Sequence, residues 1–322
     1  MIRPLPVILR QLALLACTAL AVFLLVKAGP VDPVDAYLGP AKSYIPPEQR
    51  AALIAAWGLD QSLPQQFLIW LRHLAAGDPG WSHSFNAPVA TVIGDRIGPS
   101  LVLAGGAWLL SGLSGYLLGL VAGLRAGRWP DRLITLYAYT ISATPAFWLS
   151  MAGLAVFSVT LGWTPICCSG PLGVAPDAVG VMTRLHHLAL PLLTLTVLGT
   201  AQVALHTRQK VVAIMASDPV TLARAHRASP SWILRHHLLR NAAIPALTAT
   251  LAGAGEVISG AILAEQVFAW PGLGQATITA GLQADLPLLL AISLTLAATV
   301  AMANLLADFL APRIDPRSGA RR

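Results

Sequence analysis

Long runs of apolar residues constrain this chain more than any other feature, because about 20 such residues cross a bilayer as a helix. We expect transmembrane helices at Val7–Lys27, Pro99–Leu124, Leu133–Leu161, Leu188–His206, Ala242–Ala264 and Leu286–Phe309. Only 11% of the residues are charged, against about a quarter in a typical soluble domain. So little charge cannot cover a water-soluble globule, and the sequence therefore predicts an all-α polytopic membrane protein with six transmembrane helices.

The first apolar run has some features of a secretory signal peptide. Arg3 and Arg10 lie before and within its start, as basic residues do in such peptides. However, no small-residue cleavage site follows at Lys27–Pro33, and the apolar stretch is long for a signal peptide. We therefore interpret residues 1–28 as an uncleaved N-terminal transmembrane anchor.

Lys and Arg are concentrated in alternate connections, and such connections lie on the cytoplasmic side of a membrane. The basic positions are Arg3 and Arg10; Arg125, Arg128 and Arg132; Arg208, Lys210, Arg224, Arg227, Arg235 and Arg240; and Arg313, Arg317, Arg321 and Arg322. This bias predicts that both termini lie in the cytoplasm. It also accounts for the net charge of +7 without nucleic acid as a partner.

The remaining organisation follows from this topology. Residues 29–97 form an external segment with helix-compatible stretches at Glu48–Trp57 and Gln65–Ala75. Residues 98–309 form the transmembrane core, which contains a basic cytoplasmic loop at 208–240, and residues 310–322 form a cytoplasmic tail. The Pro/Gly-rich stretch Gly162–Gly180 is expected to be a second external loop.

A stripe of small residues marks one face of the second span. Ser111, Gly115, Gly119 and Gly123 lie four residues apart, so they share one side of a helix, where another backbone can approach closely. We interpret the stripe as helix packing rather than as part of a substrate site.

The three cysteines predict no metal site and no disulfide framework. Cys17 lies in the first span, and Cys167 and Cys168 are neighbours in the loop after the third. Because adjacent cysteines form only a strained disulfide, we expect free thiols at these positions.

The connection Ser217–Arg240 predicts two short helices broken at Ser229–Pro230. Asp218 is a candidate N-cap with Pro219 at the first helical position, and Ser229 caps the second helix in the same way. Such a helix-turn-helix could act as a lever that a cytoplasmic partner pushes. A solvated basic loop at the lipid headgroups would have the same composition.

Two parts of this region resemble a known family. Asp218–Ser229 (D-P-V-T-L-A-R-A-H-R-A-S) and Ile233–Pro245 (I-L-R-H-H-L-L-R-N-A-A-I-P) resemble the cytoplasmic "EAA" loop of ABC importer permeases, in the branch that carries oligopeptides, dipeptides and nickel. Ala264–Gly274 (A-E-Q-V-F-A-W-P-G-L-G) is similar to the stretch after the fifth span in that branch.

Weaker similarities extend the resemblance over nearly the whole chain. Gly58–Asp60, Gly77–Ser84 and Pro88–Val92 are similar to the external segment of that branch, and Asp315–Arg317 resembles its C-terminal ending. One departure is Arg227, which stands where the family loop usually has glycine. Because glycine permits the turn between the two helices, we expect the turn to shift to Ala228–Pro230.

The resemblance implies a type I ABC importer permease fold, a location in the bacterial inner membrane and a set of partners. These are a second homologous permease, two ATP-binding cassette subunits, an external solute-binding protein and membrane lipid. The loop residues that would couple to the ATPase subunits are Asp218, Ala223, Arg224, Ala225, His226, Arg227, Ser229, Arg235, Arg240 and Asn241. The residues implied as structural in the second motif are Glu265, Phe268, Trp270, Pro271, Gly272 and Gly274.

An enzyme and a passive channel are the competing hypotheses. The chain lacks the phosphate loop G-x-x-x-x-G-K-[ST], and its lysines are Lys27, Lys42 and Lys210, so it is not expected to hydrolyse ATP. ATP and Mg²⁺ would be used by the partner subunits, and this chain would need no cofactor or metal. The motifs H-E-x-x-H and G-x-S-x-G are also absent from the sequence, which disfavours an intramembrane enzyme.

An acid inside the fifth span is the candidate residue of a solute pathway. Glu256 lies in the sequence G-E-V-I-S-G, and acids within spans usually face a cavity or a partner. With Ser259 and Gly260 it could line the pathway, or it could be hydrogen-bonded to a neighbouring span. Its position resembles nickel-type permeases, so a metal-chelate or other cationic solute and a di- or oligopeptide both remain open.

Overall fold

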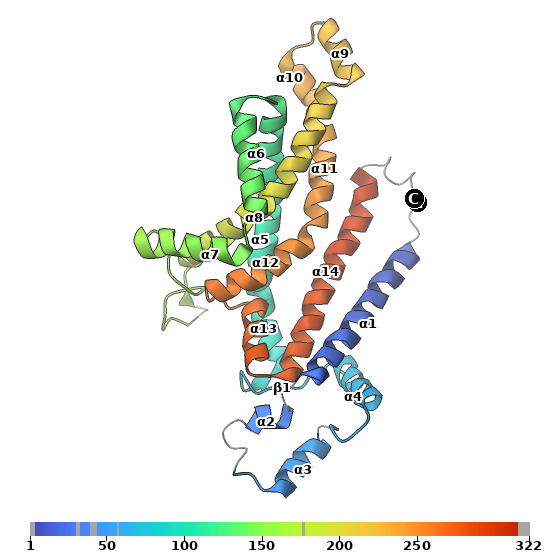
Figure 1. Cartoon of the computed structure of the whole chain (residues 1–322), viewed down its shortest axis with the longest axis vertical. Coiled ribbons are helices and arrows are strands. Elements are labelled where there is room, and N and C mark those ends of the chain that lie inside the picture. Colours follow the sequence, from blue (N-terminus) through green and yellow to red (C-terminus); the bar gives the residue numbers. More distant parts are fainter. Residues whose placement is uncertain (1–3, 30–32, 39–43, 57, 176–177, 315–322) are drawn as a thin grey trace. The chain divides into compact units, whose positions relative to one another are not determined.

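The computed structural model describes residues 4–29, 33–38, 44–56, 58–175 and 178–314, and within them the chain is mainly helical (Figure 1). It forms two compact units. The larger contains 100–270 and the last helix from Met302 onward. The smaller contains Leu5–Pro99 and Pro271–Ala301. The two long helices α5 and α14 each contribute to both units.

The larger unit is built from helices joined by short turns. In chain order these are α5 (Val89–Leu124), α6 (Trp129–Ser142), α7 (Ala146–Gly153), the π-helix η2 (Leu154–Thr160), α8 (Val181–Met215), α9 (Asp218–Ala225), α10 (Pro230–Ile233), the π-helix η4 (Leu234–Leu238), α11 (Leu239–Ala252) and α12 (Ala254–Val267). Its core lies where α5, α8 and α12 meet and includes Leu103, Leu195, Ala264 and Phe268.

The smaller unit holds the first helix and the described part of residues 29–97, the segment predicted to be external. Its elements are α1 (Pro4–Ala28), α2 (Pro33–Leu38), α3 (Pro47–Ala56), α4 (Leu63–Ala75), the strands β1 (Trp81–Ser82) and β2 (Ala87–Pro88), the first turns of α5, α13 (Leu273–Leu282) and α14 (Leu286–Ile314). β1 and β2 pair antiparallel. The helices predicted at Glu48–Trp57 and Gln65–Ala75 are α3 and α4, so that prediction is confirmed; Trp57 lies outside the described residues.

A buried acid organises the outer part of this smaller unit. Asp285, fully buried, precedes α14 and accepts hydrogen bonds from Ser82 Oγ at 2.6 Å and from the backbone N–H of Ser84 at 3.0 Å. It also accepts one from the Leu288 N–H at 3.3 Å, which caps α14. One carboxylate thus joins the β1–β2 hairpin to the start of the last span.

Four of the predicted spans are continuous helices, namely α1, α5, α8 and α14. The other two are bent pairs: α6 with α7 and η2, bent by 108°, and α10–α11 with α12, bent by 50°. The described residues therefore contain up to six spans, if each bent pair crosses the membrane once.

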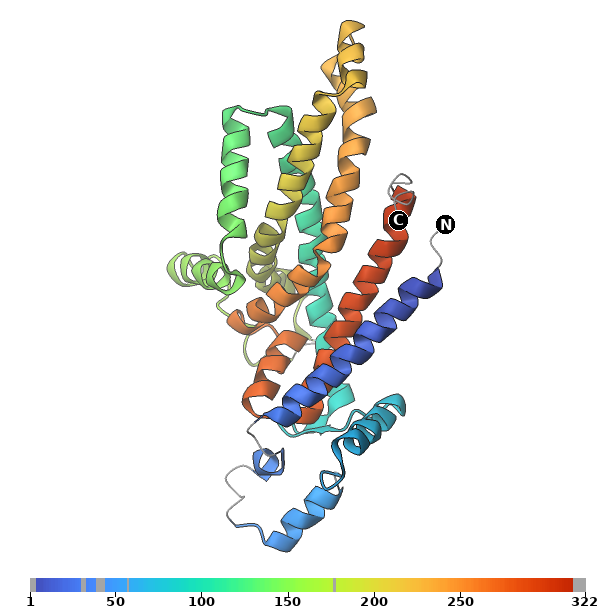
Figure 2. The ribbon, with the colours of Figure 1, turned by 45° about the vertical axis from the view of Figure 1, so that its right-hand side comes forward.

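The expectation of continuous helices at Leu133–Leu161 and Ala242–Ala264 is wrong. In the first, Pro145 lacks a backbone N–H and disfavours helical geometry at Thr144, and the chain turns so that α7 lies across the end of α6 (Figure 2). In the second, Gly253 both ends α11 and precedes α12.

The small-residue stripe of α5 packs against α8, as predicted. A Cβ added to Gly115 would lie 2.6 Å from Val203 Cβ, and one added to Gly119 would lie 2.5 Å from the Ala204 carbonyl oxygen. Gly123 is equally close to Val211. Real Cβ atoms do not approach other atoms this closely. The residues at these three positions, one in each of three consecutive turns of α5, must therefore be glycine for α8 to lie where it does.

The expectation of free thiols at Cys167 and Cys168 is wrong, because the two form a disulfide. Local contacts hold this part of the loop in place. The Cys168 N–H donates to the Phe268 carbonyl at 2.9 Å, and His187 Nδ1 lies 3.0 Å from the Cys167 carbonyl oxygen and 3.1 Å from that of Cys168. Cys17, by contrast, is a free and exposed thiol.

The α5–α8 contact yields a matched pair of substitutions. Gly119→Ala adds a methyl group where there is no room, and overpacking of this kind costs about 1–3 kcal/mol. Gly105→Ala makes the same change on the same helix, where nothing lies within 4 Å. We expect SDS unfolding of the purified protein to show a lower free energy of unfolding for Gly119→Ala alone. Equal stability of the two variants would contradict the close approach of α5 and α8.

Candidate functional site

The connection between α8 and α11 folds as a helical hairpin, which we define as residues 217–238. Its first helix, α9, has Ser217 as N-cap, so the expectation that Asp218 is the cap was wrong by one residue. Its second helix, α10, begins after Ser229, whose Oγ accepts a hydrogen bond from the Trp232 N–H at 3.3 Å, and Pro230 follows the cap. The predicted cap at Ser229 is confirmed.

The second helix of the hairpin is not a separate element. α10 has four residues and passes through the π-helix η4 directly into α11. Tyr116 of α5 donates a hydrogen bond from Oη to the Leu239 carbonyl at 3.0 Å, where η4 joins α11. The hairpin is thus continuous with α11, while only the two residues Ala216 and Ser217 separate α8 from α9.

The turn of the hairpin lies at Arg227 itself, so the expected shift to Ala228–Pro230 is wrong. Arg227 has φ of +58°, in the left-handed region that favours glycine. The Arg227 N–H donates to the Arg224 carbonyl at 2.9 Å and the Ala228 N–H to the Ala223 carbonyl at 3.0 Å. These two bonds form a Schellman motif, which holds a non-glycine residue in this conformation.

The hairpin has a small apolar core of its own. Val220 and Ala223 of α9 pack against Ile233 of α10, together with Ile214 and Met215 at the end of α8. Ala223, predicted as a coupling residue, is only 9% exposed, so its side chain packs mainly inside the hairpin. Its small size lets the two helices of the hairpin approach each other.

The other predicted coupling residues lie on the surface of the described chain. They are Asp218, Arg224, Ala225, His226, Arg227, Ser229, Arg235, Arg240 and Asn241. Two exposed apolar side chains lie among them and were not predicted. Leu222 is 61% exposed and Trp232 is 43% exposed, and Trp232 stacks on His236 with ring centroids 4.5 Å apart. We call Leu222, Trp232 and the exposed residues of α9 the outer face of the hairpin.

An ion pair fixes α8 before it enters the hairpin. Arg208 donates from Nη2 to Asp131 Oδ2 at 2.8 Å and from Nε to Oδ1. Asp131, 3% exposed, also accepts from the Gly127 N–H at 2.7 Å. The pair joins the turn between α5 and α6 to α8. Arg208 was predicted in the cytoplasmic loop but lies within α8, and Asp131 was not predicted, although an acid at the edge of a span usually has a partner.

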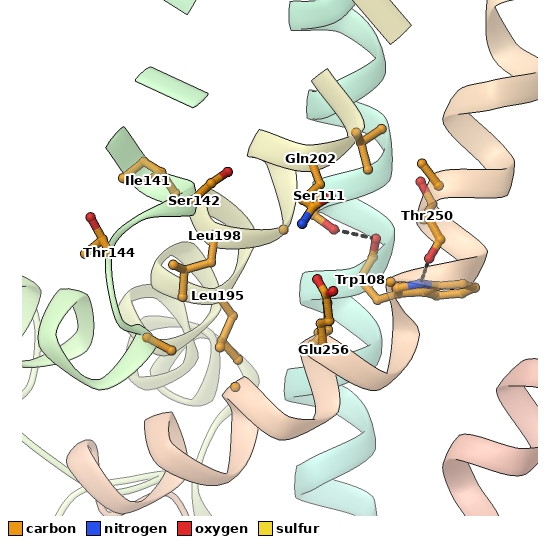
Figure 3. Close-up of a pocket in the computed structure, with 17 residues that line it drawn as sticks. Trp108, Ser111, Ile141, Ser142, Thr144, Leu195, Leu198, Gln202, Thr250 and Glu256 are labelled. Carbon is orange, nitrogen blue, oxygen red and sulfur yellow. Dashed lines mark hydrogen bonds between the residues drawn. The ribbon is translucent and has the colours of Figure 1, made fainter. Parts of the chain in front are cut away.

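A cavity of about 200 Å³ lies among α5, α6, α8, α11 and α12 (Figure 3). Of the predicted pathway residues, Glu256 and Gly260 line it, whereas Ser259 is exposed elsewhere on α12. Ser111, which was assigned to helix packing only, also lines it, and polar lining residues that were not predicted are Trp108, Ser142, Thr144, Gln202 and Thr250. Their signal in the sequence was weak, because each is a neutral residue within or beside a long apolar run.

Glu256 lies in the first turn of α12, just after the break at Gly253. Its carboxylate is directed into the cavity, on the side where Ser111 and Gln202 lie (Figure 3). Trp108 Nε1 donates to the Thr250 carbonyl beside it. Within the described chain Glu256 has neither a hydrogen-bond partner nor an ion-pair partner for its side chain, so the alternative that it is hydrogen-bonded to a neighbouring span finds no support in the structure.

The second motif of the resemblance is packed into both units. In the larger unit Glu265 is buried and accepts a 2.6 Å hydrogen bond from Ser100 Oγ, while Phe268 and Trp270 belong to the core. In the smaller unit the motif continues with Pro271, Gly272 and Gly274, of which Gly272 precedes α13. Asp315–Arg317, the proposed C-terminal ending, lies outside the described residues.

The strained turn of the hairpin gives a prediction. A non-glycine residue in the left-handed region costs about 1–2 kcal/mol, so Arg227→Gly should stabilise the protein by roughly that amount. The matched control is Arg224→Gly, which places glycine inside α9 and should destabilise it by about 1 kcal/mol. The measurement is the midpoint of unfolding in SDS. A fall in stability for Arg227→Gly would show that the contacts of the arginine side chain stabilise the protein by more than the backbone strain costs.

Comparison with known proteins supports the resemblance. Residues 115–319 match the family model described as the inner membrane component of binding-protein-dependent transport systems. The chain is 35% identical over 280 residues to a putative peptide permease protein of Brucella ovis, covering 87% of this chain and 86% of that protein. It is 35% identical to the glutathione transport system permease protein GsiC of Salmonella typhimurium, with coverage of 86% and 85%.

A third relative and a solved structure agree with these. The di/tripeptide transport system permease protein DppB of Pseudomonas aeruginosa is 32% identical, covering 88% of this chain and 89% of that protein. The crystal structure of an amino acid ABC transporter with histidines is similar in fold, with a TM-score of 0.50 at 14% identity and coverage of 69% of this chain and 94% of that one. The chain therefore belongs to the family of inner membrane components of binding-protein-dependent transport systems, and it is a permease component of an ABC importer.

Proposed function

We propose that this chain is one of two homologous permease subunits of an ATP-driven importer, and that its hairpin couples the membrane pathway to cytoplasmic ATPase subunits. The observation that carries this proposal is the outer face of the hairpin. Leu222 and Trp232 remain exposed although the hairpin has its own packed core. Two large apolar side chains exposed on one short hairpin are candidates for an interaction site.

The hairpin is built to transmit displacement. It is continuous with α11 and is joined to α8 by a two-residue turn, and both helices reach the cavity, α8 through Gln202 and α11 through Thr250. The Arg208–Asp131 pair and the glycine stripe keep α8 in contact with its neighbours. A push on the outer face would therefore reach the cavity wall through rigid helices rather than through a loop.

The partner proposed for the outer face is an ATP-binding cassette subunit. The apolar side chains of Leu222 and Trp232 would enter a groove on its surface, and Arg224 and Arg227 would pair with acids at the rim. ATP and Mg²⁺ would be bound by these partners. In this arrangement both termini and the hairpin lie in the cytoplasm, and residues 29–97 lie outside, where a solute-binding protein delivers its cargo.

The solute proposed is a short peptide or a peptide-like molecule such as glutathione. This follows the names of the relatives reported above, which are permeases for peptides, glutathione and di- or tripeptides. Those names give no support to nickel or a metal chelate as the solute. An ATP-independent channel or an intramembrane enzyme would require no ATPase partner. Recovery of ATPase subunits with the purified permease, described below, also tests these alternatives.

Shortening Leu222 tests the docking face. A buried leucine side chain contributes about 1.5–3 kcal/mol, and each 1.4 kcal/mol is tenfold in affinity. Leu222→Ala should therefore weaken recovery of the ATPase subunits with the purified permease by about tenfold or more. Leu282→Ala is the matched control, since Leu282 is 83% exposed at the end of α13.

The double variant Leu222→Ala/Trp232→Ala gives the decisive comparison. Neither side chain belongs to the hairpin's apolar core, so the hairpin should still fold, which its SDS unfolding midpoint would confirm. Full recovery of ATPase subunits with this double variant would show that the outer face is not the coupling surface.

A further inference from the structure

Glu256 is the single ionisable residue among those that line the membrane cavity. The other lining residues in the described chain are neutral, and the polar ones include Ser142, Thr144 and Gln202. Its carboxylate is exposed to the cavity and has no hydrogen-bond or ion-pair partner among the described residues. Acids within spans usually face a cavity or pair with another group. A positively charged group of a solute could therefore pair with Glu256 in the cavity.

The chemistry of the cavity limits what that positive charge can be. Transition metals are held by several His, Cys, Asp or Glu ligands, and the described residues contain no group of three that could hold a metal ion. An ammonium group, by contrast, needs one carboxylate and a few neutral acceptors for its three N–H donors. Hydroxyl and amide oxygens of Ser142, Thr144 and Gln202 lie around the cavity with Glu256.

The volume of the cavity indicates how much of a solute it holds. Sites that enclose a drug-sized ligand measure about 300–1,000 Å³, whereas this cavity has about 200 Å³. It therefore holds one end of a peptide rather than the whole molecule. The end that carries a positive charge in every unmodified peptide is the amino terminus.

We infer that Glu256 recognises the free α-ammonium group of a peptide as it passes through the membrane, which makes it a specificity-determining residue. This inference rests on the proposed function of the chain as a peptide permease. It adds a selection step inside the permease, beyond whatever selection the solute-binding protein makes. Solutes without a free ammonium group would leave the carboxylate unpaired and would pass more slowly.

A purely structural role for Glu256 is the competing explanation. It lies in the first turn of α12, where a negative charge is favoured by the helix dipole. Loss of that effect would slow transport of every solute by the same factor. Loss of recognition would slow only solutes that carry the ammonium group, so the two explanations differ in how the effect depends on the solute.

The test is a cycle of two protein variants and two solutes. Uptake of a radiolabelled dipeptide and of its des-amino analogue is measured in proteoliposomes that contain the complete importer, with Glu256 or with Glu256→Gln. The analogue is chosen among those that the binding protein accepts, and each solute is supplied at half-saturation of that protein. The binding protein is a separate polypeptide and is the same in all four measurements. Its preference between the two solutes therefore cancels when, for each solute, the uptake rate with Glu256 is divided by the rate with Glu256→Gln.

We expect Glu256→Gln to slow uptake of the dipeptide about tenfold or more, since hydrogen bonds to charged groups are worth about 1.5–3 kcal/mol. Uptake of the des-amino analogue should change less than twofold. Asp95→Asn, the same chemical change at an exposed acid of α5, should affect neither solute. Equal slowing of both solutes, or no slowing of either, would overturn the inference while leaving the proposed function intact. Absence of uptake by the wild-type importer would instead refute the proposed function.

Discussion

The close approach of α5 and α8 is the constraint on which the rest of the larger unit depends. In a bilayer, lipid tails are as apolar as the side chains, so spans associate through tight packing rather than through exclusion of water. Gly115, Gly119 and Gly123 permit that packing because any Cβ at these positions would collide with α8. At the far end of the same contact, the Arg208–Asp131 pair holds α8 to the turn that follows α5. The hairpin thus projects from helices that are fixed along their length.

Two interrupted spans give this rigid frame its polar cavity. Backbone that leaves helical geometry inside a membrane is tolerated where it lines a cavity or is buried in protein. Thr144, beside the Pro145 break, and Gly253, between α11 and α12, both line the cavity. Both breaks therefore lie beside the cavity. The second break places Glu256 in the first turn of α12, with its side chain directed into the cavity. Discontinuous helices serve the same purpose in other transporters.

Much of the fold could be predicted from the sequence because apolar runs, small-residue spacing and capping residues act locally. The four continuous spans, the helices α3 and α4, the packing role of the stripe and the cap at Ser229 were predicted correctly. The bends at Thr144–Pro145 and Gly253 were not, since proline and glycine are common within straight spans and only the surrounding helices decide whether the chain turns there. The pairing of Asp131 with Arg208, which are 77 residues apart, has no local pattern to reveal it.

The candidate site was predicted in part. The sequence placed Ala223 in the first helix of the hairpin, but it could not tell whether this side chain faces a partner or α10; the core with Ile233 shows that it faces α10. Arg227 was correctly singled out as unusual, although the hydrogen bonds of the Schellman motif hold it in place rather than shifting the turn. Leu222 and Trp232 were missed because an exposed apolar residue cannot be distinguished from a buried one until the hairpin's own core is known.

The most direct test of the whole account is ATP-dependent accumulation of a peptide by a reconstituted importer. Proteoliposomes would contain this permease with the second permease and ATPase subunits that copurify with it, with a loaded binding protein outside and ATP inside. The account predicts accumulation of a labelled dipeptide against its gradient, which stops when this chain is omitted or when a non-hydrolysable ATP analogue replaces ATP. Equal accumulation without this chain, or entry that only equilibrates and does not depend on ATP, would contradict it.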